Sequence, residues 1–140
     1  ANDIMGQDLH YYDPLTKAVT EHSMKYGFDH QRGGIYYAGP YEGEASSKEK
    51  EWWENCEALV ALLDAYERLG DKRYLETFEK TWDFCDKYLI NHQAGEWYQL
   101  VTEEGEIIDG TLGNDWKGIY HTARAMLECK NRMEKLFTLS

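Results

Sequence analysis

The sequence contains an internal repeat. One stretch, "DHQRGGIYYAGP", begins at Asp29, and a second, "NHQAGEWYQLV", begins at Asn91, a spacing of 62 residues (91 − 29). In each copy a glycine follows the shared residues, which predicts a tight turn that opens a β-hairpin. An aromatic-rich helix comes next in both copies. Two helices and one hairpin per repeat indicate a stack of helix pairs.

The repeat length limits what the chain can fold into. Its 140 residues hold about two and a quarter copies, whereas repeats of this kind usually need roughly three or more neighbours to bury their faces. We therefore predict an all-α fold in which residues 1–140 form a single incomplete domain. The chain is expected either to be a piece of a longer protein or to assemble with other chains, as in a homo-oligomer.

Four helices are predicted from capping residues and apolar spacing. Asp13 followed by Pro14 is typical of a helix start, and Gly70 is well placed to end the second helix. Tyr74, Phe78 and Cys85 belong to an apolar stripe with helical spacing in the third. The predicted ranges are 13–27, 48–69, 71–89 and from about 116 into the C-terminal tail.

The charge balance argues against two classes of partner. The formal net charge is −11, from 26 acidic and 15 basic residues, so a phosphate backbone or an anionic membrane surface would repel the chain. No apolar run approaches the roughly 20 residues of a membrane-spanning helix. We expect neither nucleic acid nor a membrane as a partner.

The cysteines indicate a reducing environment. Cys56, Cys85 and Cys129 lie within helical patterns among apolar neighbours, and no C-x-x-C pair occurs. We expect buried free thiols and a cytoplasmic location. The motifs of nucleotide, nicotinamide, serine-hydrolase and zinc-protease sites do not occur, so no cofactor or metal is expected.

His121 is the residue whose role decides the function. In the predicted fourth helix Lys117 (i−4) and Arg124 (i+3) share its face, and two cations disfavour a further positive charge there. A neutral histidine near pH 7 can accept a proton and return it. On spacing alone a structural histidine and a proton-transfer group both remain open, while the cationic neighbours argue against a metal site.

Glu57 and four tryptophans stand where the hairpins meet the helices. Glu57 interrupts an apolar helical face, so its carboxylate is expected to be hydrogen-bonded, either within a site or as a cap on the adjacent hairpin. The tryptophans are either core residues or a binding platform, and tryptophan with glutamate and arginine is the composition that a sugar site needs. They are Trp52, Trp53, Trp97 and Trp116.

Three motifs occur in a specific order. They are Trp-Trp-x-x-x-Glu within "KEWWENCEALVALLDAY", Gly-Glu-Trp-Tyr at the end of "GDKRYLETFEKTWDFCDKYLINHQAGEWY", and Trp-Lys-x-x-Tyr-His-x-x-Arg in "WKGIYHTARA". From about Phe28 to Glu128 the chain resembles the C-terminal part of the N-acylglucosamine 2-epimerase superfamily, which includes the cellobiose 2-epimerases. The resemblance implies part of an (α/α)6 barrel, with four long helices in helix-pair repeats and two short β-hairpins.

The resemblance also implies a function, that of a sugar 2-epimerase or aldose-ketose isomerase that requires no metal. In this family two histidines on opposite sides of an open-chain sugar transfer the C2 proton through an enediolate. Carried over, His121 is one of these groups and Glu57 is the carboxylate that helps to orient the site. Trp53 and Trp116 match substrate-stacking tryptophans, and Arg124 matches the motif arginine, which we assign to substrate binding.

Part of the family pattern is missing. The other catalytic histidine belongs to a Gly-His-Asp-x-x-Glu motif, which this sequence lacks. We therefore expect a C-terminal segment of an enzyme acting on a mono- or disaccharide, inactive alone and associated with the rest of its barrel or with further copies. The alternative is a non-catalytic carbohydrate-binding or oligomerising helical module. A glycoside hydrolase is weaker still, because Asp109 and Asp115 are poor candidates for a second carboxylate.

Overall fold

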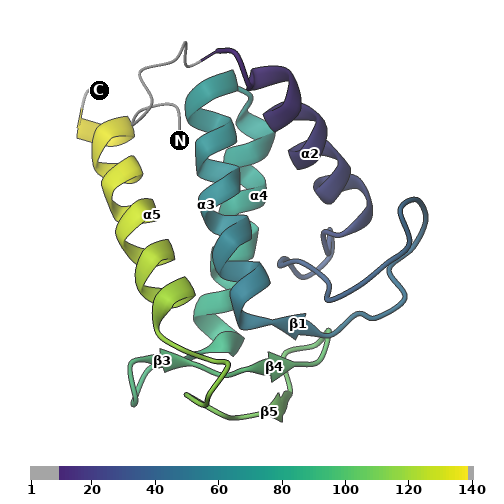
Figure 1. Cartoon of the computed structure of the whole chain (residues 1–140), viewed down its shortest axis with the longest axis vertical. Coiled ribbons are helices and arrows are strands. Elements are labelled where there is room, and N and C mark those ends of the chain that lie inside the picture. Colours follow the sequence, from purple (N-terminus) through teal and green to yellow (C-terminus); the bar gives the residue numbers. More distant parts are fainter. Residues whose placement is uncertain (1–9, 139–140) are drawn as a thin grey trace.

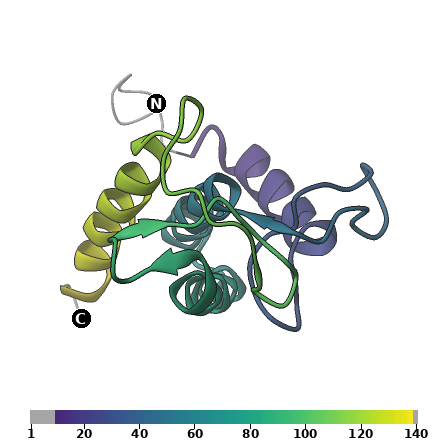
Figure 2. The same cartoon turned by 90° about the horizontal axis from the view of Figure 1, so that it is seen from below.

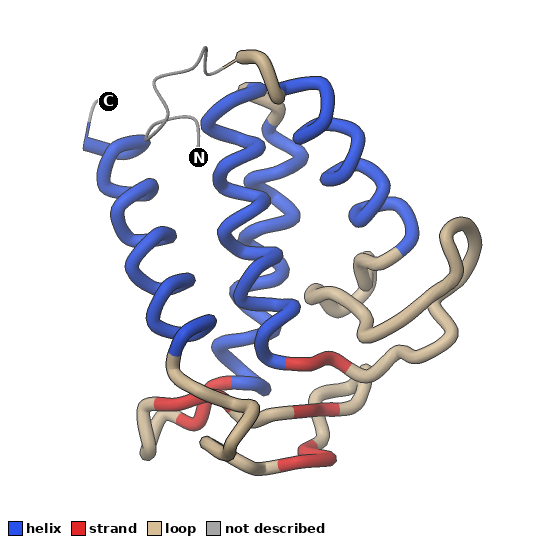
Figure 3. The backbone as a smooth tube through the Cα atoms, viewed as in Figure 1, coloured by secondary structure: helices blue, strands red, loops and turns tan. Residues whose placement is uncertain are grey.

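Four helices stand side by side, and the strands lie at one end of them. The structure is a computed structural model that describes residues 10–138. In Figure 1, α3 and α4 occupy the centre between α2 and α5, and Figure 3 shows the strands gathered below the helices. The helices of the described part are α2 (Asp13–Tyr26), α3 (Trp52–Leu69), α4 (Lys72–Phe84) and α5 (Tyr120–Thr138).

The predicted helices are present, with later starts for two of them. Strand β1 (Lys50–Glu51) takes up residues that were predicted as helix, so α3 begins at Trp52. The third predicted helix is α4, which continues as a π-helical turn, η1 (Cys85–Leu89). The fourth was predicted from about Trp116, but α5 begins at Tyr120.

A side-chain turn explains the late start of α5. The Oδ1 atom of Asn114 accepts hydrogen bonds from the backbone N–H groups of Trp116 at 2.8 Å and Lys117 at 2.7 Å. Asparagine side chains commonly hold such turns, which compete with helical hydrogen bonding. Residues 114–117 therefore form a turn before the helix and do not belong to it.

The core surrounds α3, which packs against α2, α4 and α5. Its centre includes Leu59 and Leu63 of α3, both fully buried because they lie one turn apart on the same face. Trp52 and Trp97 are also buried, so two of the four junction tryptophans are core residues. No helix within residues 10–138 is long and apolar enough to cross a bilayer.

The prediction of buried free thiols is confirmed. All three cysteines are buried and none forms a disulfide. Burial raises the pKa of the Cys85 thiol well above its usual value and that of the Cys129 thiol to about 11. These thiols are protonated near pH 7 and pack as small apolar side chains.

The two repeat copies share one turn geometry. The Oδ1 atom of Asp29 accepts hydrogen bonds from the N–H groups two and three residues further on, at 2.9 Å each, and Asn91 does the same at 3.0 Å each. Four residues on, the N–H of Gly33 or Gly95 donates to the carbonyl of that same residue at 2.8 Å. Both glycines have positive φ, 88° and 71°, which other residues rarely adopt.

The strands that flank these turns differ between the copies. In the second copy β2 (Ile90–Asn91) and β3 (Glu96–Trp97) pair antiparallel as a hairpin. In the first, pairing is limited to single bridges, between Phe28 and Ile35 and between Ala38 and Ser47. The glycine turn recurs in both copies, but a regular ladder forms only in the second.

A three-stranded antiparallel sheet, which the repeat does not predict, holds the start of α3. Its order is β1-β4-β5, with β4 at Leu100–Val101 and β5 at Ile107–Asp109. Seen from below in Figure 2, the strands cross the ends of the central helices. Because β1 runs directly into α3, this sheet fixes the first turn of the helix that carries Trp53 and Glu57.

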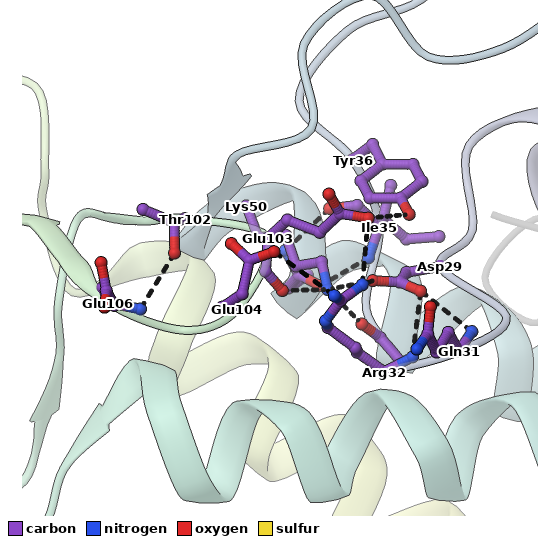
Figure 4. A network of polar contacts seen from close by, with 12 residues as sticks. Asp29, Gln31, Arg32, Ile35, Tyr36, Lys50, Thr102, Glu103, Glu104 and Glu106 are labelled. Carbon is purple, nitrogen blue, oxygen red and sulfur yellow. Dashed lines mark hydrogen bonds and ion pairs between the residues drawn. The ribbon is translucent and has the colours of Figure 1, made fainter.

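A buried ion pair ties the first glycine turn to β1 (Figure 4). The Lys50 ammonium is fully buried and donates to Asp29 Oδ2 at 2.9 Å and to the Gly33 carbonyl at 2.7 Å. Burial alone would raise the pKa of Asp29, but hydrogen bonds from Lys50 and from the Arg32 backbone outweigh it and hold that pKa below its usual value. Arg32 also reaches Glu103 at 3.2 Å, so the turn after β4 joins the same network.

Candidate active site

The first two turns of α3 and of α5 bring together four of the five predicted site residues. Glu57 bridges the helices: its Oε1 lies 2.9 Å from Nδ1 of His121, and its Oε2 accepts a hydrogen bond from Nη1 of Arg124 at 2.5 Å. The ring of Trp53 lies 5.7 Å from the His121 ring, centroid to centroid. The expectation that Glu57 is hydrogen-bonded is confirmed, and its partners are side chains of α5.

The Glu57 contact sets the tautomer of His121. An ionised carboxylate only accepts hydrogen bonds, so Nδ1 must carry the proton in this pair. Nε2 is then the basic nitrogen of the neutral ring, and within residues 10–138 it has no hydrogen-bond partner. The His121 and Glu57 side chains are 33% and 35% exposed, so the pair borders solvent. Such a histidine can take up a proton while the carboxylate stabilises the charge.

The predicted pairing of His121 with Lys117 on one helical face is wrong. Lys117 precedes α5, and its ammonium turns inward, where it is buried 3.0 Å from the Leu112 carbonyl and 3.4 Å from Glu96 Oε1. The Asn114 turn causes this difference, because it removes Lys117 from the helical register. The charged side chain in contact with His121 is therefore Glu57, which in turn contacts Arg124.

Trp116 lies apart from the other predicted residues. It is 93% exposed, and within the described part of the chain its ring makes no stacking contact with His121 or Trp53. Trp53 is 38% exposed, and its Nε1 donates to Glu51 Oε2 at 2.6 Å, which fixes the indole beside His121. One tryptophan is thus held in the cluster and the other stands in solvent on the segment before α5.

The sequence of the described helices also matches a protein family. The model of the N-acylglucosamine 2-epimerase (GlcNAc 2-epimerase) family matches residues 10–125. The chain belongs to this family. The matched range includes Trp53, Glu57, His121 and Arg124, so the whole cluster lies inside it.

The relatives are sugar-converting enzymes of which this chain covers less than a third. The chain is 26% identical over 118 residues to D-mannose isomerase from Marinomonas mediterranea, covering 84% of this chain and 30% of the relative. It is 35% identical over 88 residues to cellobiose 2-epimerase from Ruminococcus albus, covering 61% of this chain and 22% of the relative. A crystal structure of a D-mannose isomerase superposes with a TM-score of 0.80 at 25% identity, covering 87% of this chain and 31% of that one.

The barrel prediction is confirmed by these neighbours. They are (α/α)6 barrel enzymes, and the matching portion is about 30% of each. The four helices of this epimerase-family chain therefore have the arrangement of about one third of such a barrel.

Glu54 lies beside this cluster, and the sequence analysis missed it. It lines a groove of about 280 Å³ between α2 and α3, together with Trp53 and Glu57. Its Oε2 is buried, without a hydrogen-bond partner among residues 10–138. Burial, with a smaller contribution from Glu51, raises the pKa of Glu54 to about 7. The sequence feature that could have indicated Glu54 is its position three residues before Glu57, which places both on the same side of the helix.

We expect the pH dependence of folding to reveal Glu54. Because its folded-state pKa is about 7, above the usual 4.5, its stabilising contribution is complete below about pH 4.5 and is lost as the pH rises through 7. Glu54→Gln should therefore gain stability relative to wild type between pH 5 and 8, on the order of 2 kcal/mol after allowance for partial exposure. Urea unfolding at both pH values measures the difference, with exposed Glu79→Gln as the control. An equal difference at pH 5 and pH 8 would contradict the assignment.

Proposed function

We propose that this chain supplies one proton-transfer group of a sugar 2-epimerase or aldose-ketose isomerase, acting within a complete barrel. The observation that carries the proposal is the Glu57 carboxylate between His121 and Arg124. It leaves Nε2 as the basic nitrogen of His121. The ring is partly exposed to solvent and lies beside the indole of Trp53. The family match and the names of the relatives support the same reaction class.

The proposed reaction begins with an open-chain sugar beside Trp53. Nε2 of His121 accepts the proton from C2, the C2–H electron pair forms the C1–C2 double bond, and the carbonyl electrons move to O1 to give an enediolate. Return of a proton to C2 on the opposite face, as the O1 carbonyl reforms, gives the epimer. Return of a proton to C1, together with transfer of the O2–H proton to O1, gives the ketose. Glu57 stabilises the imidazolium that forms, and the opposite-face donor comes from another part of the barrel.

The substrate class follows from the same surface. A tryptophan face stacks on a sugar ring, while a guanidinium and carboxylates bond to its hydroxyl groups. Trp53, Arg124 and Glu57 provide these groups within one cluster. We propose a neutral mono- or disaccharide, of the kind named by the relatives: D-mannose, an N-acylated hexosamine or cellobiose.

Sugar conversion and sugar binding, measured separately, test the proposal. A complete barrel that contains this segment is assayed with D-mannose, N-acetylmannosamine and cellobiose, and binding is followed by calorimetry. We expect conversion of at least one of them to its C2 epimer or ketose. Binding without conversion would instead support a non-catalytic carbohydrate-binding module. Neither binding nor conversion would contradict both.

Trp116→Ala should weaken binding without stopping the chemistry. Its exposed indole lies five residues before His121, on the segment that leads into α5, where it can stack on a sugar that enters from solvent. Since stacking contributes equally to ground state and transition state, the KM and the Kd should rise about 2- to 10-fold while kcat changes little. Tyr41→Ala, at an aromatic residue on another loop that is also largely exposed, is the control. An unchanged Kd in Trp116→Ala would remove Trp116 from the site.

A further inference from the structure

Lys117 is a buried cation outside the cluster that the proposed reaction uses. Its side chain is 1% exposed, and its Nζ lies 3.4 Å from Glu96 Oε1 and donates to the Leu112 carbonyl at 3.0 Å. The ammonium also lies 5.2 Å from the centre of the Trp52 ring. A buried ammonium is costly unless it is paired, so these three contacts hold it in one place.

Glu96 connects this cation to the helix that carries His121. The carboxylate accepts a hydrogen bond from the Trp97 backbone N–H at 2.7 Å, which anchors it in strand β3. Its Oε2 lies 3.3 Å from the hydroxyl of Thr122, the residue after His121, and that hydroxyl is also 3.1 Å from the Ile119 carbonyl. The carboxylate therefore contacts both the segment before α5, through Lys117, and the first turn of α5 itself.

The pair joins the loop before α5 to the neighbouring strands, whereas α5 itself also packs on α3. Residues 110–119 contain no helix or strand, and Asn114 Nδ2 donates to Oε1 of Gln99, which lies between β3 and β4, at 2.9 Å. The ion pair, buried at its Lys117 end, links that loop to strand β3 and to the first turn of α5. The ammonium contacts Trp52, which precedes Trp53 on α3. The pair therefore also lies next to the helix that carries Trp53 and Glu57.

We propose that Glu96 and Lys117 are positioning residues that set His121 against Glu57. This inference rests on the proposed function for its catalytic consequence, but its structural part does not. Shifting the start of α5 moves His121 relative to Glu57, and the 2.9 Å hydrogen bond that fixes the Nδ1–H tautomer lengthens. The His121 ring then populates both neutral tautomers, so Nε2 is the basic nitrogen in only some of the molecules. Misplacement of a catalytic group by about 1 Å can also lower the rate on the order of 10²-fold.

The ring nitrogens of His121 report the positioning without any catalysis. Long-range ¹H–¹⁵N correlation spectra of the 140-residue chain at neutral pH should show an Nδ1–H tautomer for His121 in wild type. Lys117→Met and Glu96→Gln should each convert these signals to those of mixed tautomers. Lys130 is an exposed lysine on α5, the helix of His121, and Lys130→Met should leave the signals unchanged. Glu96→Gln keeps the size of Glu96 and its contacts with the Trp97 N–H and the Thr122 hydroxyl, and removes the charge that pairs with Lys117. It therefore remains a fair test if Lys117→Met fails to fold.

A kinetic split tests the catalytic consequence in a complete barrel. Both variants should lower kcat by about 10- to 100-fold while KM changes by less than about threefold, because neither residue lies in the sugar-binding cluster. Altered ring signals with no enzymatic activity in wild type would uphold the positioning and reject the proposed function. Unchanged ring signals in the folded Glu96→Gln chain would overturn the positioning role.

Discussion

Replacing His121 with Asn is expected to slow sugar conversion by about 10²- to 10⁴-fold, the range that one positioned general acid/base contributes. Asparagine keeps a polar group that can face Glu57, but it has no nitrogen that accepts a proton near pH 7. Trp53 and Arg124 stay in place, so the Kd for the sugar should change little. The measurement is steady-state conversion in a complete barrel, together with calorimetric binding.

A second histidine provides the matched control. His92 lies in the β2–β3 turn, where its Nε2 is 2.8 Å from the Asp86 carbonyl, outside the cluster. His92→Asn should convert sugar at the wild-type rate. If His121→Asn also retains the wild-type rate, then His121 is a structural residue, one of the two roles that the sequence alone leaves open.

Glu57→Gln is expected to lower kcat by up to about 10⁴-fold, as loss of an orienting carboxylate does in other histidine-dependent sites. Arg124 is a donor, so the glutamine oxygen turns toward it and the amide NH₂ faces Nδ1 of His121. Nδ1 must then accept, which moves the ring proton to Nε2 and removes the base. The imidazolium also loses its carboxylate. The His121 tautomer and kcat are the two readouts, and they should change together.

The far ends of the same helices supply the control for Glu57. Glu67 of α3 pairs with Arg132 of α5, a glutamate–arginine bridge between the same two helices without a histidine. Glu67→Gln should leave kcat and the His121 tautomer as in wild type, whatever its effect on stability. Equal losses of activity in both variants would mean that bridging the helices, and not orienting His121, is what matters.

The fold could be predicted from the sequence where local chemistry repeats. Asp29 and Asn91 make the same turn with a glycine four residues on, and this signal is readable because it lies within five residues. The β1-β4-β5 sheet could not be predicted, because Lys50 pairs with Val101 across a sequence separation of 51 residues (101 − 50). The start of α5 was also predicted wrongly. Helical spacing extends back to Trp116, but the Asn114 side chain binds the Trp116 N–H, so the helix begins only at Tyr120.

The site was predicted as a set of residues and not as a geometry. Motif spacing placed Glu57 and His121 in one family pattern, but only the packing of α3 on α5 shows the bond between them. Helical periodicity put Lys117 beside His121, although the residue lies before the helix and turns into the interior. Glu54 was missed because its burial depends on α2, which no motif connects to it.

The most direct test of the proton-transfer role of His121 is deuterium uptake at C2 in D₂O, measured separately with D-mannose and D-glucose. The two C2 epimers present their C2 protons on opposite faces, and a base on one side of the sugar serves only one of them. In a complete barrel, His121→Asn should lose uptake by about 10²-fold or more with one epimer and keep it with the other. Uptake at the wild-type rate with both sugars would contradict the account.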